Sequence, residues 1–249
     1  MPLVLLPAYP LDCRVWQAMA AQLPWGVRAI AVDLPGQGHS DIGGLAPSID
    51  LAADAVYRSL TSYGIANAVV VGMSMGGYVA LALADRHPGF VAGLGLVDTK
   101  STADTDEARA RRIATARELE MSQTLQAAMG MPGILLGQSS LEHRRDLLAT
   151  LEGWVRGQSP LGLAWSQRAM ARRGDKTGML RHFIGPVSVV VGDQDEITPL
   201  SDAQHMADAA PDSTLTLVPG AGHLSALEDP YTVAAALNAL HAQVVPHRR

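Results

Sequence analysis

The chain has 249 residues and a formal net charge of −5, a size that suits one large α/β domain or two small ones. No block rich in lysine and arginine stands out, which argues against a nucleic-acid partner, and no apolar run approaches the length of a membrane span. The single Cys13 excludes an intrachain disulfide and fits a reducing compartment, so we expect a cytoplasmic protein.

Six short apolar runs recur along the chain, and helical patterns lie between them. Most of these runs are continuously apolar rather than alternating, as expected for strands that are buried on both faces of a parallel sheet. Strands that alternate with helices imply right-handed crossovers and an open sheet with helices on both faces. The predicted strands are 3–6, 28–32, 68–71, 93–97, 187–191 and 214–218, and the helices are 13–22, 49–62, 75–87, 200–209 and 231–241.

Residues 101–183 interrupt this alternation, because they hold no convincing strand and the pattern is helical throughout. An insertion of this length between adjacent strands is more than a connector. The glycines and Pro132 within 127–140 divide it into separate helices. We therefore expect an α/β core domain made of 1–100 and 184–249, with 101–183 as a helical cap inserted after the fourth strand.

The sequence VVVGMSMGGYVALA, residues 69–82, joins the third strand to a helix through Ser74. Such a tight turn forces its central residue into a strained backbone conformation, where side chains two positions away on either side would collide. Gly72 and Gly76 occupy those two positions. The turn raises the hydroxyl to the carboxyl edge of the sheet, where the first N–H groups of the helix favour negative charge. Ser74 is therefore a candidate nucleophile.

A serine nucleophile needs a base and an acid that orients the base. His223 follows the last strand on a glycine-containing loop, and Asp195 follows the fifth strand, so both belong to the same edge as Ser74. We predict that His223 is the base and that Asp195 is the acid. The rivals for the acid are Asp98, which follows the fourth strand, and Asp193.

Four motifs together carry a family resemblance. They are GMSMGG (72–77), DLPGQGHS (33–40), GDQD (192–195) and GH (222–223), and the serine, aspartate and histidine come in the chain order of α/β-hydrolases. The chain resembles that superfamily over nearly its whole length and is most similar to small esterases and lactonases of the β-ketoadipate enol-lactonase-like branch. The resemblance implies an α/β-hydrolase fold with a mostly parallel sheet and a helical cap. Because the family usually has eight strands and six are visible, it also implies that the first two family strands are missing.

The loop after the first strand departs from the family pattern. Relatives have His-Gly-x-Pro there, whereas this chain has PAYP at 7–10. The oxyanion hole of the family uses backbone donors, and proline has no N–H. We therefore expect the backbone N–H groups of Tyr9 and Met75 to hold the oxyanion.

The resemblance implies a cofactor-independent, metal-free serine hydrolase that cleaves a carboxylic ester or lactone with a hydrophobic moiety through an acyl-enzyme. The same triad would also serve a thioesterase, a carbon–carbon bond hydrolase or a cofactor-free haloperoxidase, and a ligand receptor that keeps the triad is the non-enzymatic alternative. We expect a small-molecule substrate and a monomer or homodimer. The inner face of the cap would form a pocket wall, and the pocket candidates are Tyr9, Met129, Trp154, Trp165 and Leu224.

Overall fold

The computed structural model describes residues 1–245 and contains one sheet of six parallel strands in the order β2-β1-β3-β4-β5-β6. The strands lie where the apolar runs predict them, because a parallel sheet covered on both faces favours continuous apolar sequence. The four central strands are almost wholly buried, whereas the edge strands β2 and β6 are partly exposed. The strands are Leu3–Leu6 (β1), Ala29–Ala31 (β2), Ala68–Met73 (β3), Val91–Val97 (β4), Val187–Gly192 (β5) and Ser213–Val218 (β6).

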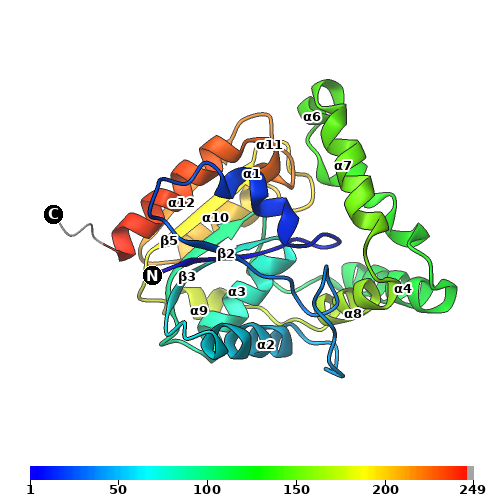
Figure 1. The fold of residues 1–249 in the computed structure, drawn as a ribbon, viewed down its shortest axis with the longest axis horizontal. Coiled ribbons are helices and arrows are strands. Elements are labelled where there is room, and N and C mark those ends of the chain that lie inside the picture. Colours follow the sequence, from blue (N-terminus) through cyan, green and yellow to red (C-terminus); the bar gives the residue numbers. More distant parts are fainter. Residues whose placement is uncertain (246–249) are drawn as a thin grey trace.

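Helices cover both faces of this sheet. Figure 1 shows α1 and α12 on one face and α2 and α3 on the other, while α10 packs against β5 and β6. None of the helices in the described range 1–245 has the length and apolar character that crossing a bilayer requires. The helices outside the segment between β4 and β5 are Cys13–Trp16 (the 3-10 helix η1), Gln17–Ala20 (α1), Ile49–Ser62 (α2), Met75–Arg86 (α3), Leu200–Ala209 (α10), Ser225–Glu228 (α11) and Pro230–Val244 (α12).

The helix predicted over 13–22 is present, but it ends at residue 20 and its first turn is a 3-10 helix. The chain first forms the 3-10 helix η1, where Asp12 caps the start by accepting from the Arg14 N–H at 3.1 Å, and α1 then adds only four residues. Pro24 follows closely, and a proline disfavours helical geometry in the residue before it. The helix predicted over 49–62 coincides with α2, which begins after its N-cap Ser48.

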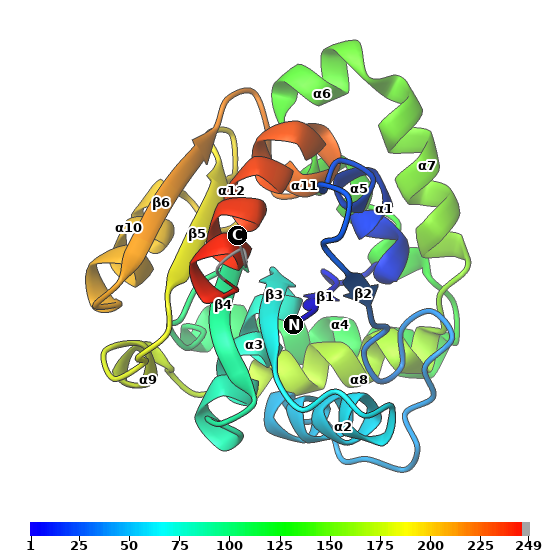
Figure 2. The ribbon, with the colours of Figure 1, turned by 60° about the vertical axis from the view of Figure 1, so that its left-hand side comes forward.

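Between β4 and β5 the described chain contains helices and no strand, as the sequence predicts. Figure 1 shows α4 and α6–α8 gathered at the end of the molecule toward which the strands run, and Figure 2 shows α4 beside α8. Helix α9 instead packs against α3 and α10, so 101–183 as one cap domain stays a prediction. The helices are Asp106–Ser122 (α4), Gln126–Ala128 (the 3-10 helix η2), Met131–Leu135 (α5), Gln138–His143 (α6), Arg145–Arg156 (α7), Pro160–Ala171 (α8) and Thr177–Leu180 (α9).

Helix α8, in the segment predicted to form the cap, meets the core at a close backbone contact between Gly36 and Gly162. An added Cβ on Gly162 would lie 1.9 Å from the Gly36 carbonyl oxygen, so a side chain there would push α8 away from the loop after β2. Trp165, one turn further along α8, donates its indole N–H to the Leu45 carbonyl oxygen at 2.7 Å. These contacts hold α8 beside the carboxyl edge of the sheet.

Candidate active site

Ser74 lies at the sharp turn between β3 and α3. Its backbone angles are φ 51° and ψ −114°, a conformation that a non-glycine residue rarely adopts. An added Cβ on Gly72 would lie 2.1 Å from the Gly76 carbonyl oxygen, and one on Gly76 would lie 2.2 Å from the Leu6 carbonyl oxygen. The turn can close this tightly only with glycine at both positions. This agrees with the steric explanation that the sequence analysis gives for Gly72 and Gly76.

His223 bridges Ser74 and Asp195. Its Nε2 lies 2.7 Å from the Ser74 Oγ, and its Nδ1 lies 2.8 Å from the Asp195 Oδ2. Ser74 follows β3, Asp195 follows β5 and His223 follows β6. The carboxyl ends of these strands share one edge of the sheet. His223 is 2% exposed and Asp195 is 6% exposed, so water screens their interaction only weakly. The structure thus brings together the three residues that the sequence predicts as a triad.

Thr198, which is absent from the predicted site, orients the Asp195 carboxylate. The Asp195 Oδ1 accepts from the N–H groups of Ile197 and Thr198 at 2.8 and 3.0 Å, and the Oδ2 accepts from the Thr198 hydroxyl at 2.8 Å. Burial alone would raise the pKa of Asp195, but hydrogen bonds from His223 and Thr198 outweigh it and lower that pKa. The sequence held a signal for this arrangement, since an aspartate commonly accepts from N–H groups shortly after it in an Asx turn.

Asp98, the first rival for the acid, holds the two catalytic loops together without contacting the imidazole. It is fully buried at the end of β4, in a left-handed conformation with φ 46°. Its carboxylate accepts from the Gly192 N–H at 3.1 Å and from the N–H and hydroxyl of Ser225 at 2.8 and 2.7 Å. Gly192 precedes Asp195 by three residues and Ser225 follows His223 by two, so Asp98 connects the segments that carry Asp195 and His223.

Asp193, the second rival, accepts from the Gly220 N–H at 2.7 Å and braces the same two loops from outside. Within residues 1–245, Asp195 is the one carboxylate that forms a hydrogen bond to His223. The geometry therefore favours Asp195 among the three acids.

Asp98 should make the stability of the fold depend on pH. Burial and, second, the negative charge of Asp195 raise the pKa of Asp98 to about 7. Between about pH 4 and pH 7 the folded state therefore holds a proton that the unfolded state has lost. The contribution of Asp98 to the free energy of unfolding consequently falls as the pH rises through that window. Relative to Asp98→Asn, we expect the wild-type protein to lose on the order of 4 kcal/mol over this range.

Urea unfolding at several pH values measures this difference between wild type and variant. Asp106→Asn removes an exposed carboxylate on α4 and serves as the matched control, for which no such trend is expected. Parallel pH dependences for the wild type and Asp98→Asn would show that Asp98 is ionised throughout the range.

The two expected oxyanion donors lie on adjacent segments. The loop after β1 packs against the first turn of α3. The contact is so close that an added Cβ on Gly76 would lie 2.8 Å from the Pro7 carbonyl oxygen. Tyr9 belongs to this loop, and Met75 is the first residue of α3. Neither N–H is hydrogen-bonded to another backbone group in the described part of the chain, so both can serve a ligand oxygen. Their role as an oxyanion hole stays a prediction.

The Tyr9 side chain lines a cavity of about 220 Å³ together with residues of the cap helices α4 and α8. Met131 contributes apolar surface to this cavity, and Arg111, Arg112 and Gln167 contribute polar groups. Burial raises the pKa of Tyr9 to about 12, so the phenol keeps its proton near neutral pH. Neither Ser74 nor His223 lines this cavity, so contact of the Tyr9 side chain with a substrate stays a prediction.

The other four pocket candidates have different surroundings. Trp165 is buried and makes the contact between cap and core described above. Trp154 is half-buried, and the Arg14 guanidinium lies 5.4 Å from its ring centroid. Met129 is half-buried, and Leu224 is fully buried beside the histidine. Contact of these four side chains with a substrate stays a prediction.

Glu228 attaches the histidine loop to the cap. Its Oε1 accepts from the N–H groups of Gly222 and Leu224 at 2.9 and 3.3 Å, on either side of His223. Its Oε2 accepts from the Gly137 N–H at 2.9 Å, and Gly137 lies in the segment between α5 and α6. One carboxylate therefore links the loop of His223 to the segment between α5 and α6.

Asp12, Cys13 and Asp33 lie close enough together to hold a metal ion, but their donor atoms already have partners. Asp12 pairs with the Arg14 guanidinium and accepts from the Gln158 amide, and Asp33 accepts from the Cys13 N–H. Burial and, second, the contact with Asp33 raise the pKa of the Cys13 thiol to about 12, which disfavours the thiolate that a metal would need. We therefore assign no metal to this group.

Comparisons with known proteins agree on one family. A family model described as "alpha/beta hydrolase fold" matches residues 1–230. The chain is 32% identical over 229 residues to a pimeloyl-[acyl-carrier protein] methyl ester esterase of Chromobacterium violaceum, covering 88% of this chain and 86% of the relative. It is 30% identical over 251 residues to a 2-succinyl-6-hydroxy-2,4-cyclohexadiene-1-carboxylate synthase of Enterobacter sp., covering 94% and 89%.

A solved structure agrees with these sequence matches. A thermophilic esterase from Thermogutta terrifontis, with malate bound, matches the fold with a TM-score of 0.92 at 30% identity, covering 98% of this chain and 90% of that one. The α/β-hydrolase fold predicted from the four motifs is confirmed. The chain belongs to the alpha/beta hydrolase fold family, among its esterase-type members.

Proposed function

We propose that the protein is a serine hydrolase that cleaves a carboxylic ester or lactone with a hydrophobic moiety. The observation that carries the proposal is the buried His223, within hydrogen-bond reach of both the Ser74 Oγ and the Asp195 Oδ2. Acyl transfer needs a nucleophile, a base and an orienting acid in this mutual contact. The esterases among the similar proteins support the same reaction class.

In the first half of the reaction, the Ser74 Oγ attacks the ester carbonyl carbon while the His223 Nε2 takes the hydroxyl proton. Asp195 accepts from the Nδ1–H and stabilises the imidazolium that forms. The N–H groups of Tyr9 and Met75 hold the negative oxygen of the tetrahedral intermediate. When the intermediate collapses, the C–O bond of the ester breaks and the alcohol leaves with the proton from His223.

In the second half, a water molecule attacks the acyl-enzyme while the His223 Nε2 takes one of its protons. Collapse of this intermediate breaks the bond to the Ser74 Oγ, which recovers its proton from the imidazolium. The acid product leaves, and the triad returns to its starting protonation. In a lactone the leaving hydroxyl remains attached to the acyl group, so one molecule leaves at the end.

The cavity beside Tyr9 supports a small-molecule substrate. The Tyr9 ring and Met131 offer apolar surface to a hydrophobic acyl or alcohol part, while Arg111 and Gln167 offer polar groups. The single Cys13 supports a reducing compartment, from which we infer a cytoplasmic protein.

A fluorophosphonate probe and a substrate panel test this function. We expect the probe to label Ser74 stoichiometrically, and p-nitrophenyl esters or lactones to be turned over faster than thioesters. Preferential turnover of thioesters, of carbon–carbon bonds or of halide and peroxide would assign the same triad to a thioesterase, a carbon–carbon bond hydrolase or a haloperoxidase. Failure of the probe and of every substrate would favour a ligand receptor.

The pH dependence of kcat/KM should report the base. His223 can take the serine proton only as neutral imidazole, so kcat/KM should fall toward acid pH. Asp195 remains ionised there, because its pKa is lowered. Asp98→Asn should keep this acid limb, which separates the base from the Asp98 carboxyl. A profile that stays flat at every acid pH at which the protein remains folded would contradict the assignment of the base.

A further inference from the structure

The chain between α5 and α6 lies against the loops that carry Asp195 and His223. We call residues 135–139 of this chain the anchor segment. Its first three residues are buried, and the His223 N–H donates to the Leu135 carbonyl oxygen at 2.9 Å. The backbone of the histidine itself is therefore bound to a segment that lies between β4 and β5 in the sequence.

Glu228 makes a second link between the anchor segment and the loop of His223. Its carboxylate accepts from the N–H groups of Gly222 and Leu224 on one side and from the Gly137 N–H on the other. None of these three N–H groups has a backbone acceptor in the described chain, so the carboxylate satisfies donors that would otherwise stay unpaired. The two backbones also touch directly, since an added Cβ on Gly222 would lie 2.2 Å from the Gly137 nitrogen.

Gln194 links the anchor segment to the loop of Asp195. Its Oε1 accepts from the Ser139 N–H at 2.9 Å, and its Nε2 donates to the Ser139 Oγ at 2.8 Å. Its own N–H donates at 2.8 Å to the carbonyl oxygen of Ala221, two residues before His223. Gln194 immediately precedes Asp195. The neighbour of this aspartate is therefore bound both to the anchor segment and to the histidine loop.

These links affect the chemistry through distance. The imidazole of His223 has to stay within hydrogen-bond reach of both the Ser74 Oγ and the Asp195 Oδ2. Ser74 is fixed by its turn between β3 and α3, whereas Asp195 and His223 lie on loops after β5 and β6. A loop side chain keeps a precise position only where neighbouring groups hold it. A misplacement of about 1 Å can lower the rate about 10²-fold.

We propose that Glu228 and Gln194 are positioning residues, which use the anchor segment to hold the loops of His223 and Asp195 in place against Ser74. Within residues 1–245 neither side chain forms a hydrogen bond to Ser74 or to the imidazole, so both act through the loops. The inference rests on the proposed function, because it concerns the same triad.

Glu228→Ala and Gln194→Ala test the proposal in the whole chain. We expect each to lower kcat for an ester by about 10–100-fold while KM stays within about twofold, because reacting geometry is lost rather than substrate binding. Gln194→Glu should restore kcat to within about threefold of wild type, because a carboxylate can accept both from the Ser139 N–H and from the Ser139 hydroxyl.

Proton NMR supplies a readout that needs no substrate. The His223 Nδ1–H, which is hydrogen-bonded to Asp195, should give a downfield signal in the wild type as long as its exchange with water is slow. We expect this signal to broaden or disappear in Glu228→Ala and Gln194→Ala, while circular dichroism shows that both remain folded. A merely structural role would lower the melting temperature and leave the signal of the folded molecules unchanged.

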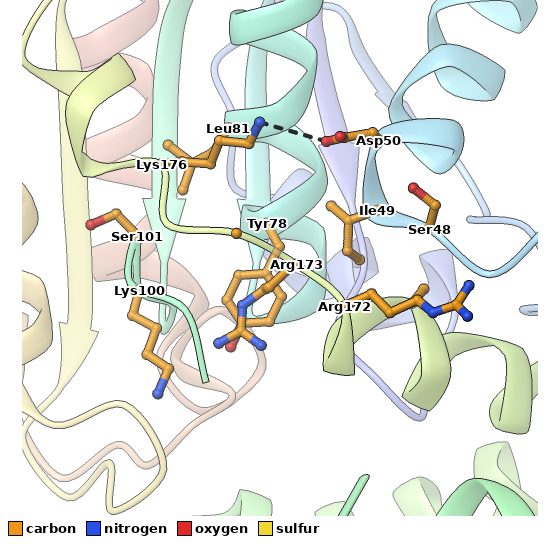
Figure 3. Close-up of a pocket in the computed structure, with 12 residues that line it drawn as sticks. Ser48, Ile49, Asp50, Tyr78, Leu81, Lys100, Ser101, Arg172, Arg173 and Lys176 are labelled. Carbon is orange, nitrogen blue, oxygen red and sulfur yellow. Dashed lines mark ion pairs between the residues drawn. The ribbon is translucent and has the colours of Figure 1, made fainter. Parts of the chain in front are cut away.

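Lys176→Ala is the matched control for Glu228→Ala. Lys176 also joins the chain between β4 and β5 to the core through one charged side chain, which lies 2.7 Å from the Asp85 carboxylate and 3.6 Å from that of Asp50. Figure 3 shows the ion pair with Asp50. These carboxylates belong to α3 and α2 and not to the catalytic loops, so kcat should stay within about twofold of wild type and the NMR signal should persist.

Gln158→Ala is the matched control for Gln194→Ala, since the Gln158 amide also accepts from a backbone N–H, that of Gly38, and donates to an oxygen, that of Asp12. It should keep both kcat and the NMR signal. An unchanged kcat and signal in Glu228→Ala and Gln194→Ala, or equal losses in the two controls, would overturn the inference. A wild type that turns over no substrate would contradict the proposed function instead, and the NMR comparison would then decide the inference alone.

Discussion

Ser74→Ala should lower kcat for an ester substrate by about 10⁵–10⁶-fold. Alanine has no hydroxyl, so no acyl-enzyme can form, and only the binding surface and the oxyanion donors remain to assist direct attack by water. The fold should persist, because the one hydrogen-bond partner of the Ser74 hydroxyl within residues 1–245 is His223. Alanine also carries no more side chain than serine at the strained φ of 51°, so we expect a melting temperature within about 4 °C of wild type.

Steady-state kinetics on the best substrate of the panel, with circular dichroism for folding, measures both effects. Ser59→Ala, on the exposed face of α2, is the matched control and should keep full activity. Fluorophosphonate labelling should disappear with Ser74 and survive in the control. Retained turnover in a folded Ser74→Ala protein would refute the nucleophile assignment.

The sheet could be predicted closely because each strand is a local, continuously apolar run. The predicted 3–6 coincides with β1, and the other strands differ from prediction by one to two residues at their ends. Helix α2 could be predicted equally well, since its N-cap and its apolar periodicity are local features of the sequence. The segment 13–22 was predicted less well, because nothing local in it distinguishes a 3-10 turn from an α-helix.

The triad candidates could be predicted because parallel strands deliver their carboxyl ends to one edge. A residue just after such a strand is close to every other residue in that position, whatever the distance along the chain. The same argument could not choose among Asp195, Asp98 and Asp193, since all three follow strands. The choice depends on side-chain direction, which only the hydrogen bonds to His223 reveal.

The supporting contacts could not be predicted, because they join segments that carry no shared pattern. Glu228 reaches Gly137 across 91 positions of the chain, and Asp98 reaches Ser225 across 127. The docking of Trp165 on the Leu45 carbonyl is similar. Each of these residues is ordinary in its local sequence, so its role follows from packing of the cap and loops rather than from a motif.

Asp195→Asn should lower kcat by about 10⁴-fold while leaving substrate affinity nearly unchanged. An asparagine amide in this position would donate to the His223 Nδ1, which then has to act as an acceptor. The proton of the neutral imidazole moves to the Nε2, the atom that lies 2.7 Å from the Ser74 Oγ. That nitrogen can no longer take the hydroxyl proton, so the variant loses general-base catalysis although the distances remain similar.

Asp98→Asn is the informative comparison, because it makes the same carboxyl-to-amide change at a buried residue that contacts Gly192 and Ser225 instead of the imidazole. The His223 tautomer is preserved in this variant, so kcat should fall by less than about tenfold. Urea unfolding of both variants shows whether lost stability accounts for lost activity. If Asp98→Asn costs the larger factor in a folded protein, Asp98 is the acid that supports the base, and the hydrogen bond between His223 and Asp195 is structural.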